Sequence, residues 1–243
     1  MLGEPFARRR PRYPREGVEE ESDMIFEDRV DAGRRLAKKL TAYAKRDDVI
    51  VLGIPRGGVP VAFEVANALD APLDVFLSRK LGVPGQEELA FGAVATGGVR
   101  VLDQELIEGL GISKQEVEEI TARVRHELER RERVYRGSRA PLKLEGRTVL
   151  LVDDGIATGS SMRAAIDALR QMKPARLVVA VPVAPLSTCH RLRSVVDDLV
   201  CVDMPEAFYA IGQFYGDFSQ VTDEEVTELI HRAAQQHSAQ KSA

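Results

Sequence analysis

The most informative stretch of the chain runs Val149-Leu150-Leu151-Val152-Asp153-Asp154-Gly155-Ile156-Ala157-Thr158-Gly159-Ser160-Ser161. Four apolar residues predict a buried strand, two carboxylates follow it, and a loop of small and hydroxyl-bearing residues leads into a predicted helix. The free N–H groups of such a loop, together with the helix dipole, suit a phosphate dianion. The adjacent carboxylates suit the vicinal hydroxyls of a sugar or a hydrated divalent metal. The stretch therefore predicts a site for a sugar phosphate, and the structural alternative is a helix N-terminus with small packing residues.

Outward from this stretch, the chain alternates between predicted strands and helices. Apolar runs predict strands over 49–54, 73–77, 148–153, 176–182 and 198–202. Apolar periodicity predicts helices over 28–45, 59–69, 113–136, 160–172, 187–195 and 223–236. Residues 89–95 and 99–102 flank Gly97-Gly98 and predict a hairpin. Strands separated by helices pair in parallel through right-handed crossovers, so we expect an α/β fold with a doubly wound, mainly parallel sheet.

Composition excludes several classes of protein. The 243 residues are 44% hydrophobic and carry a formal charge of −4, which argues against a general nucleic-acid binder. No apolar run approaches the roughly eighteen residues of a membrane helix. Two cysteines are too few for a disulfide framework or a four-cysteine zinc site. We therefore expect a cytoplasmic protein without a nucleic-acid or membrane partner.

Two segments, residues 1–23 and the predicted helix 113–136, are rich in charged residues. Residues 1–23 combine prolines with a basic block and an acidic block, which predicts a disordered tail ahead of a single domain over 24–243. A basic arm that touches phosphate is the alternative. The helix 113–136 is rich in arginine, but its charges pair at i,i+4, which predicts a solvated, salt-bridged face. The predicted pairs are Glu119–Arg123, Glu127–Arg131, Glu129–Arg133 and Glu132–Arg136.

The stretch 149–161 resembles the 13-residue phosphoribosyl-diphosphate (PRPP) motif of type I phosphoribosyltransferases. Many members end the motif in Thr-Gly-Gly-Thr, whereas this chain has Thr158-Gly159-Ser160-Ser161, which keeps small, hydroxyl-bearing residues. The resemblance covers 24–243 and includes Gly212-Gln213-Phe214-Tyr215-Gly216-Asp217-Phe218, which is similar to a bacterial subgroup of the family. It implies the doubly wound family fold, here with an insertion of hairpin and long helix and with a small C-terminal hood.

A second loop, Ile54-Pro55-Arg56-Gly57-Gly58, follows the first predicted strand. Its N–H groups lie at the same predicted sheet edge, its glycines allow backbone to approach a ligand closely, and Arg56 can contact phosphate bidentately. The resemblance implies that this is the pyrophosphate loop, which family members often hold with a non-proline cis peptide. Lys80, in Ser78-Arg79-Lys80, is a further candidate for the pyrophosphate, and a solvated basic pair is the alternative.

The resemblance implies transfer of the phosphoribosyl group of PRPP to a nitrogenous acceptor, with release of pyrophosphate and with Mg²⁺ as cofactor. Arg56, Gly57, Gly58 and Lys80 would bind pyrophosphate, and Asp153 and Asp154 would hold the ribose hydroxyls. The 5′-phosphate would be bound by Ala157, Thr158, Gly159, Ser160 and Ser161. Mg²⁺ would be held by PRPP and water, with Asp153 and Asp154 as further candidate ligands. A homo-oligomer is compatible with this assignment.

Two features bear on the acceptor. Members that use 6-oxopurines often have an Asp where this chain has Ala157, so a general base for hypoxanthine or guanine is missing at that position. Aromatic residues cluster over 208–215, and Tyr209 and Phe214 are candidates for a stacking wall against a small heterocyclic acceptor. The alternative is that these aromatic residues pack a C-terminal lid onto the sheet.

Three rival functions have different requirements. A non-catalytic PRPP sensor or regulator would share every ligand-binding residue, and only turnover separates it from an enzyme. A phospho-acceptor receiver domain would need its acids after the first strand. A serine hydrolase would need a Gly-x-Ser-x-Gly elbow between strand and helix, which the chain lacks.

Overall fold

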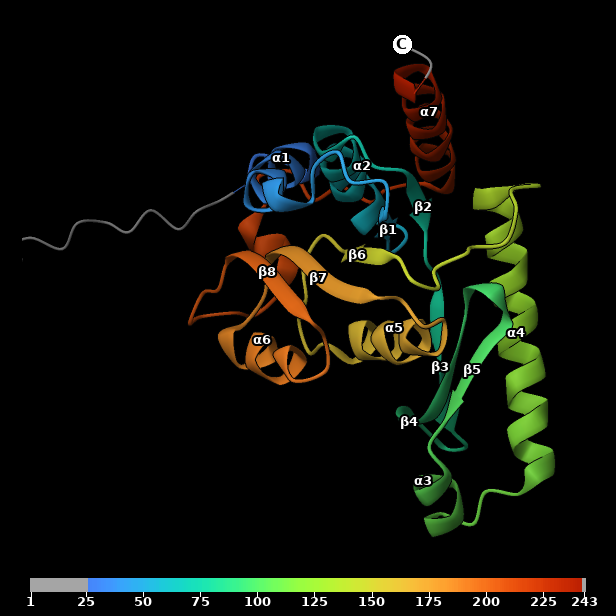
Figure 1. Ribbon diagram of the computed structural model, residues 1–243. Helices are drawn as coiled ribbons and strands as arrows, with labels where there is room; N and C mark the ends of the chain where they lie inside the picture. Colours follow the sequence, from blue (N-terminus) through green and yellow to red (C-terminus); the bar gives the residue numbers. More distant parts are fainter. Residues whose placement is uncertain (1–25, 242–243) are drawn as a thin grey trace, which may run out of the picture.

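A five-stranded parallel sheet forms the centre of the protein, and the computed structural model describes residues 26–241 (Figure 1). Its strands follow the order β2 (Leu73–Val75), β1 (Val49–Gly53), β6 (Thr148–Val152), β7 (Arg176–Val183) and β8 (Asp198–Asp203). Every neighbouring pair is parallel. β1 and β6 are buried at every position, because helices cover both faces of the sheet. This burial explains why both strands are continuous apolar runs rather than alternating ones.

Helices flank the sheet on both sides, as Figure 1 shows. One apolar cluster joins the sheet to α1 (Arg29–Lys39), α2 (Gly58–Leu69) and α7 (Asp223–Lys241). A second cluster joins the opposite face to α5 (Ser160–Gln171) and α6 (Leu186–Arg193). Successive residues of one strand alternate between the clusters, as Val51 and Leu52 do in β1. The predicted doubly wound α/β fold is confirmed.

A smaller antiparallel sheet forms the insertion, with strands β3 (Ser78–Val83), β4 (Gln86–Ala95) and β5 (Val99–Leu102). The β4–β5 hairpin is as predicted, whereas β3 is not, because Ser78-Arg79-Lys80 is expected to follow the strand over 73–77 rather than to begin another strand. The second strand of the central sheet ends instead at Val75. Arg79 and Lys80 are exposed in β3, which is held by backbone pairing to β4. No apolar run therefore marks this strand in the sequence.

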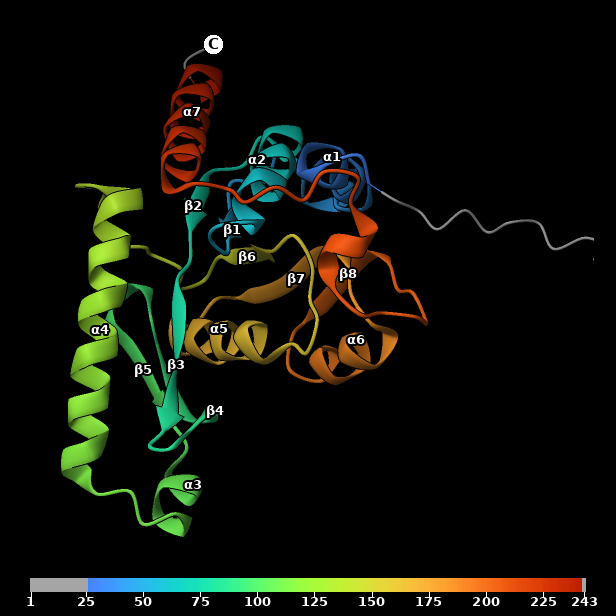
Figure 2. The ribbon, with the colours of Figure 1, turned by 180° about the vertical axis from the view of Figure 1, so that it is seen from behind.

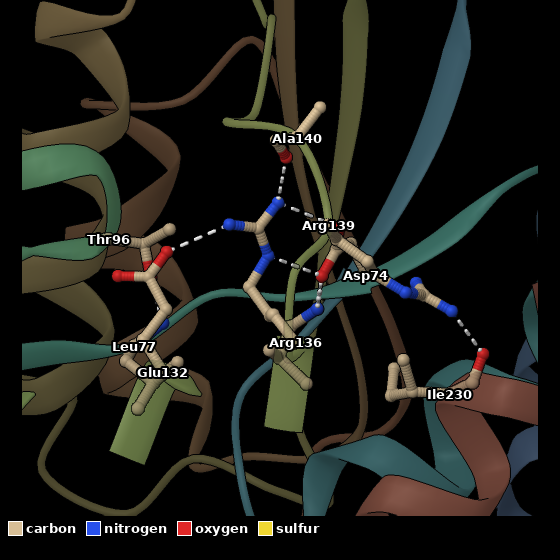
Figure 3. Close-up of polar contacts among 9 residues, drawn as sticks. Asp74, Leu77, Thr96, Glu132, Arg136, Arg139, Ala140 and Ile230 are labelled. Carbon is tan, nitrogen blue, oxygen red and sulfur yellow. Dashed lines mark hydrogen bonds and ion pairs between the residues drawn. The ribbon is translucent and has the colours of Figure 1, made fainter. Parts of the chain in front are cut away.

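The long helix α4 (Lys114–Arg136) covers one face of this small sheet, and its last two residues, Tyr135 and Arg136, are buried. Arg136 is 8% exposed and donates to both carboxylate oxygens of Asp74 at 3.0 and 3.2 Å and to Ala140 O at 2.6 Å (Figure 3). The prediction of a solvated ladder is thus wrong for Arg136. Within residues 26–241, two of the four predicted ion pairs form: Glu127–Arg131 and Glu132–Arg136. The buried pair with Asp74 anchors the insertion to β2.

The helices differ from the prediction by more than two residues at two boundaries, and one further α-helix is present. α1 ends at Lys39, and the apolar periodicity up to residue 45 continues through a 3-10 helix, Thr41–Tyr43, that buries Tyr43. A short helix that was not predicted, α3 (Gln104–Gly109), is capped by Asp103. α7 continues to Lys241 rather than ending at residue 236. None of the helices described over 26–241 is long and apolar enough to cross a membrane.

Residues 204–222 connect β8 to α7, and we call this segment the hood. It contains a short 3-10 helix, Ile211–Phe214, and passes beside the start of α1 (Figure 2). Phe26 N donates to Phe214 O at 2.8 Å, and Gly216 N donates to Phe26 O at 2.7 Å. The first described residues of the chain therefore hold the hood in place. The predicted tail over 1–23 lies outside the described residues.

Candidate functional site

The two predicted phosphate loops meet at the carboxyl edge of the central sheet. β1 and β6 are neighbours, with Gly53 opposite Val152, and Ile54 N donates to Val152 O at 2.9 Å. β1 leads into α2 on one face of the sheet, whereas β6 leads into α5 on the other. This reversal is a topological switch point, where open α/β sheets bind their ligands.

The glycines of the loop 54–58 make room for the two aspartates. A Cβ atom on Gly57 would lie 1.9 Å from Asp154 Oδ2, and one on Gly58 would lie 2.8 Å from Asp153 Oδ1. The φ of Gly57 is −61°, so the position requires space rather than an unusual backbone conformation. The Pro55–Arg56 peptide is cis, as the resemblance implied. Besides allowing a ligand to approach, the glycines allow the two loops to pack against each other.

Asp153 and Asp154 lie in contact, and each carboxylate shifts the pKa of the other. Asp154 N donates to Asp153 Oδ1 at 2.9 Å. Burial raises the pKa of Asp153 well above its usual range, and the neighbouring charge of Asp154 adds to the shift. Burial also raises the pKa of Asp154, and Arg29 opposes that shift. Such carboxylates are strong acceptors, and they favour partners that donate hydrogen bonds or bring positive charge.

Two residues hold Asp154 in contacts that the sequence does not predict: Arg29, which is not among the candidate residues, and Tyr215, which is expected only in the aromatic cluster over 208–215. Arg29 Nε donates to Asp154 Oδ2 at 2.8 Å, and each side chain is 11% exposed. The hydroxyl of Tyr215 donates to Asp154 O at 2.5 Å. Arg29 lies in the first turn of α1, directly after the N-cap residue Asp28, where an arginine is typical of a solvated surface. No local signal links it to a carboxylate so distant in sequence.

The phosphate loop is braced from α6. Thr188 Oγ1 donates to Ala157 O at 2.9 Å, and Arg191 Nη2 donates to Thr158 O at 3.2 Å. Gly159 has a φ of +82° and caps the N-terminus of α5. Thr158 and Ser160 are exposed, and their hydroxyl oxygens lie 3.3 Å apart. Protein donors thus occupy two carbonyls of the loop, while two hydroxyls and the helix N-terminus face outward, an arrangement suited to an anion.

Arg56 extends from the cis peptide toward the N-terminus of α7. Its Nη1 lies 3.7 Å from Asp223 Oδ1, and its side chain is 37% exposed. Tyr135, in α4, donates to the same Asp223 oxygen at 2.6 Å. A cavity of about 270 Å³ is lined by Arg56 and residues 220–224. Within the described residues 26–241, the guanidinium therefore has a single long ion pair, and it lines an open cavity.

The other predicted site residues lie apart from these loops. Lys80 Nζ is 2.8 Å from Glu88 Oε2 on the small sheet, and no contact among residues 26–241 joins it to Arg56 or to the aspartates. Tyr209 is 89% exposed, whereas Phe214 is 5% exposed and stacks on Phe208 with ring centroids 5.2 Å apart. Tyr209 has a free ring face, and Phe214 packs as the lid alternative requires.

Comparison with known proteins places these loops in a family. The model of the phosphoribosyl transferase domain matches residues 21–219. A Mycobacterium tuberculosis protein that is named for the same family, without an acceptor, is 44% identical over 209 residues, which are 86% of this chain and 47% of that protein. The chain thus spans about half the length of these two curated relatives. The bifunctional protein PyrR of a Roseiflexus species is 32% identical over 136 residues, 55% of each protein.

A solved structure agrees with the fold. The crystal structure of TT1426 from Thermus thermophilus is 43% identical, with a TM-score of 0.78, and the match covers 86% of this chain and 99% of that one. Taken with the family match over 21–219, this means that the chain belongs to the phosphoribosyl transferase family.

Proposed function

We propose that the protein transfers the phosphoribosyl group of PRPP to a nitrogenous acceptor and releases pyrophosphate. The observation that carries the proposal is the contact of Gly57 and Gly58 with Asp154 and Asp153 at the switch point. It puts an arginine-bearing, strand-to-helix loop, two carboxylates and a hydroxyl-rich helix N-terminus at one sheet edge. A substrate with a diphosphate, vicinal hydroxyls and a second phosphate matches these groups in order along that edge.

Each group then has a role in the transfer. Asp153 and Asp154 accept hydrogen bonds from the ribose hydroxyls and orient C1′, and residues 157–161 bind the 5′-phosphate. The bond from C1′ to the pyrophosphate oxygen breaks as the bond to the acceptor nitrogen forms, with oxocarbenium character in between, as in other glycosyl transfers. Arg56 and the N–H groups of its loop stabilise the charge that develops on the pyrophosphate. The long ion pair of Arg56 with Asp223 leaves guanidinium donors available for that task.

Mg²⁺ fits this site when it arrives with the substrate. In the part of the chain that the structure describes, no group of three or more His, Cys, Asp or Glu side chains could hold a metal ion. The donors at the site are two carboxylates, and Arg29 already binds one of them. Because Mg²⁺ keeps several waters and needs few protein carboxylates, Asp153 would hold the hydrated ion beside the pyrophosphate. When bound, it neutralises charge on the leaving group.

The acceptor that we propose is a small heterocycle that needs no strong deprotonation, such as adenine or a non-purine azole. Ala157 supplies no carboxylate at the position where a proton acceptor for a 6-oxopurine would stand. The exposed ring of Tyr209 is the candidate for a stacking contact, because its face is free in the hood.

The test is release of pyrophosphate from PRPP and Mg²⁺ against a panel of purines, pyrimidines and small azoles. We expect turnover with at least one acceptor and none in the Asp153→Asn, Asp154→Asn double variant. Binding of PRPP by calorimetry without turnover on any acceptor would favour the PRPP sensor instead. If millimolar PRPP with Mg²⁺ does not bind at all, the proposal is wrong.

A further inference from the structure

The segment Gly212–Phe218, together with Ser219, surrounds the guanidinium of Arg29. Nε of Arg29 donates to Asp154 Oδ2 at 2.8 Å, and Nη1 donates to Ser219 O at 2.8 Å. The Phe218 ring centroid lies 4.0 Å from the guanidinium carbon, and the Tyr215 centroid lies at 5.9 Å. A charged side chain that is 11% exposed is thus held by a carboxylate, a carbonyl and two aromatic rings.

The small and acidic residues of this segment shape the enclosure. A Cβ on Gly212 would lie 2.9 Å from Phe218 Cδ1, so glycine at this position gives the Phe218 ring its place. The Asp217 carboxylate accepts from Ser219 N at 2.8 Å, which forms a local turn. This turn presents the carbonyl of Ser219 to Arg29.

Backbone pairing ties the same segment to the start of α1. Gly216 N donates to Phe26 O at 2.7 Å, and Asp217 N donates to Glu27 O at 2.8 Å. Arg29 follows this paired segment within a single helical turn. The hood is therefore bonded to the same segment that carries Arg29, the residue that the hood encloses.

The ion pair of Arg29 and Asp154 lies directly against the predicted pyrophosphate loop. A Cβ on Gly57 would lie 1.9 Å from Asp154 Oδ2 and 3.2 Å from Arg29 Nε. Any shift of either side chain toward the loop would therefore collide with its backbone. Two adjacent carboxylates in this confined space repel each other, and a fixed guanidinium offsets that repulsion on one of them.

We propose that Arg29 is a positioning residue that holds Asp154 for the ribose of PRPP, and that the hood residues Gly212–Ser219 hold Arg29. The proposal rests on the proposed function, because it assumes that Asp154 contacts PRPP. It assigns a physical task to the segment 212–218, which lies outside both phosphate loops. Its consequence is that PRPP affinity depends on hood residues that do not contact PRPP.

The first experiment compares Arg29→Gln with Arg35→Gln. Arg35 is a matched control, because it lies on the same helix, pairs with Asp31 at 2.8 Å and stacks over the Phe26 ring at 5.3 Å. We expect Arg29→Gln to weaken PRPP binding by roughly ten- to a hundredfold in calorimetry, as loss of one partner of a buried charge pair does. We expect Arg35→Gln to change it less than about twofold, because the Arg35–Asp31 pair is only partly buried and neither side chain contacts Asp154.

A double-mutant cycle tests whether the hood acts through Arg29. Phe218→Ala should weaken PRPP binding several-fold in the parent protein and not further in the Arg29→Gln background, because coupled residues are not additive. Arg29→Lys keeps the charge and loses the planar fork, so its affinity should lie between those of the parent and Arg29→Gln. The cycle can be run with Arg29→Lys if Arg29→Gln does not fold. If Arg29 and Phe218 only stabilised the fold, their substitution would lower the melting temperature. The non-additive losses of PRPP affinity and the intermediate affinity of Arg29→Lys would then be absent.

The outcomes separate the two proposals. If the parent protein binds PRPP and Arg29→Gln or Arg29→Lys binds it equally well, the role of Arg29 is wrong and the proposed function stands. Additive effects of the Arg29 and Phe218 substitutions would overturn the role of the hood. Failure of the parent protein to bind PRPP with Mg²⁺ overturns the proposed function, and the role of Arg29 at the ribose falls with it.

Discussion

The loops at the sheet edge and the hood differ in what fixes their positions. The loops 54–58 and 153–159 follow paired strands, so the register of β1 and β6 sets where they lie. The hood has little regular structure beyond Ile211–Phe214, and it is held by side-chain contacts and by a short pairing with residues 26–27. The comparison shows that one half of the site is built by the sheet and the other by individual side chains. Substitutions in the loops should therefore cause large losses of PRPP binding, whereas substitutions in the hood should cause partial losses of ligand affinity.

The largest effect is expected for Gly57→Ala. The added methyl would lie 1.9 Å from Asp154 Oδ2, so either the loop or the carboxylate must move. We expect a lower melting temperature and loss of PRPP binding by more than about a hundredfold, because the displaced carboxylate is a proposed ligand of PRPP. Gly109→Ala is the control, because nothing lies within 4 Å of its Cβ position. Calorimetry and thermal melts of both variants give the comparison, and an unchanged Gly57→Ala protein would contradict it.

The second-largest effect is expected when the charge of Asp153 is removed by Asp153→Asn. Its pKa in the folded protein is raised well above its usual value, so its contribution to stability is present below the unfolded pKa and is lost as the pH rises through the folded pKa. Asp153→Asn does not titrate, so it should melt higher than the parent at neutral pH, while the gain should shrink toward pH 4. PRPP binding should be lost at the same time. Melts over pH 4–8, without PRPP and Mg²⁺, check the prediction, and a lower melting temperature for the variant at pH 7 would contradict it.

Arg56→Ala should affect turnover more than stability. Because Arg56 is half exposed and its partner Asp223 lies 3.7 Å away, the side chain contributes little to the fold. We expect kcat to fall by roughly 10²–10³, as for the loss of one preorganised transition-state donor, and inhibition by pyrophosphate to weaken. The control is Arg46→Ala. Arg46 precedes β1 and pairs with Asp48 at the surface, so this variant should leave kcat unchanged. If pyrophosphate inhibits the Arg56 variant as strongly as the parent, Arg56 lies outside the site.

The most selective effect is expected in the hood, where Tyr209→Ala and Phe214→Ala should act on different quantities. Tyr209→Ala should raise the KM of the acceptor by roughly ten- to a hundredfold, the range for loss of one base–aromatic stack, and leave the melting temperature unchanged. Phe214→Ala should destabilise the fold by about 3–5 kcal/mol, because the ring is buried. Steady-state kinetics and thermal melts of both variants test this difference. Equal effects on both quantities would show that the hood behaves as one packed unit.

Two differences between the prediction and the structure have different causes. β3 is not marked by an apolar run, because Arg79 and Lys80 are exposed and the strand depends on backbone pairing with β4, which follows it directly. Arg136 is expected on a solvated face because its i,i+4 partner Glu132 is visible in the sequence, whereas Asp74 lies 62 residues away. Local patterns carry no information on a partner as distant as Asp74.

The alternation of strands and helices, and the residue types of the loops 54–58 and 153–161, can be recognised from the amino-acid sequence alone. Periodicity, capping and turn composition depend on neighbours along the chain, so they need no structure. The pairing of Arg29 with Asp154, the position of Gly57 against the same carboxylate, and the burial of Phe214 beside an exposed Tyr209 become visible in the folded protein. Burial and ion pairing depend on which distant segments pack together, and that packing is settled by the whole chain at once.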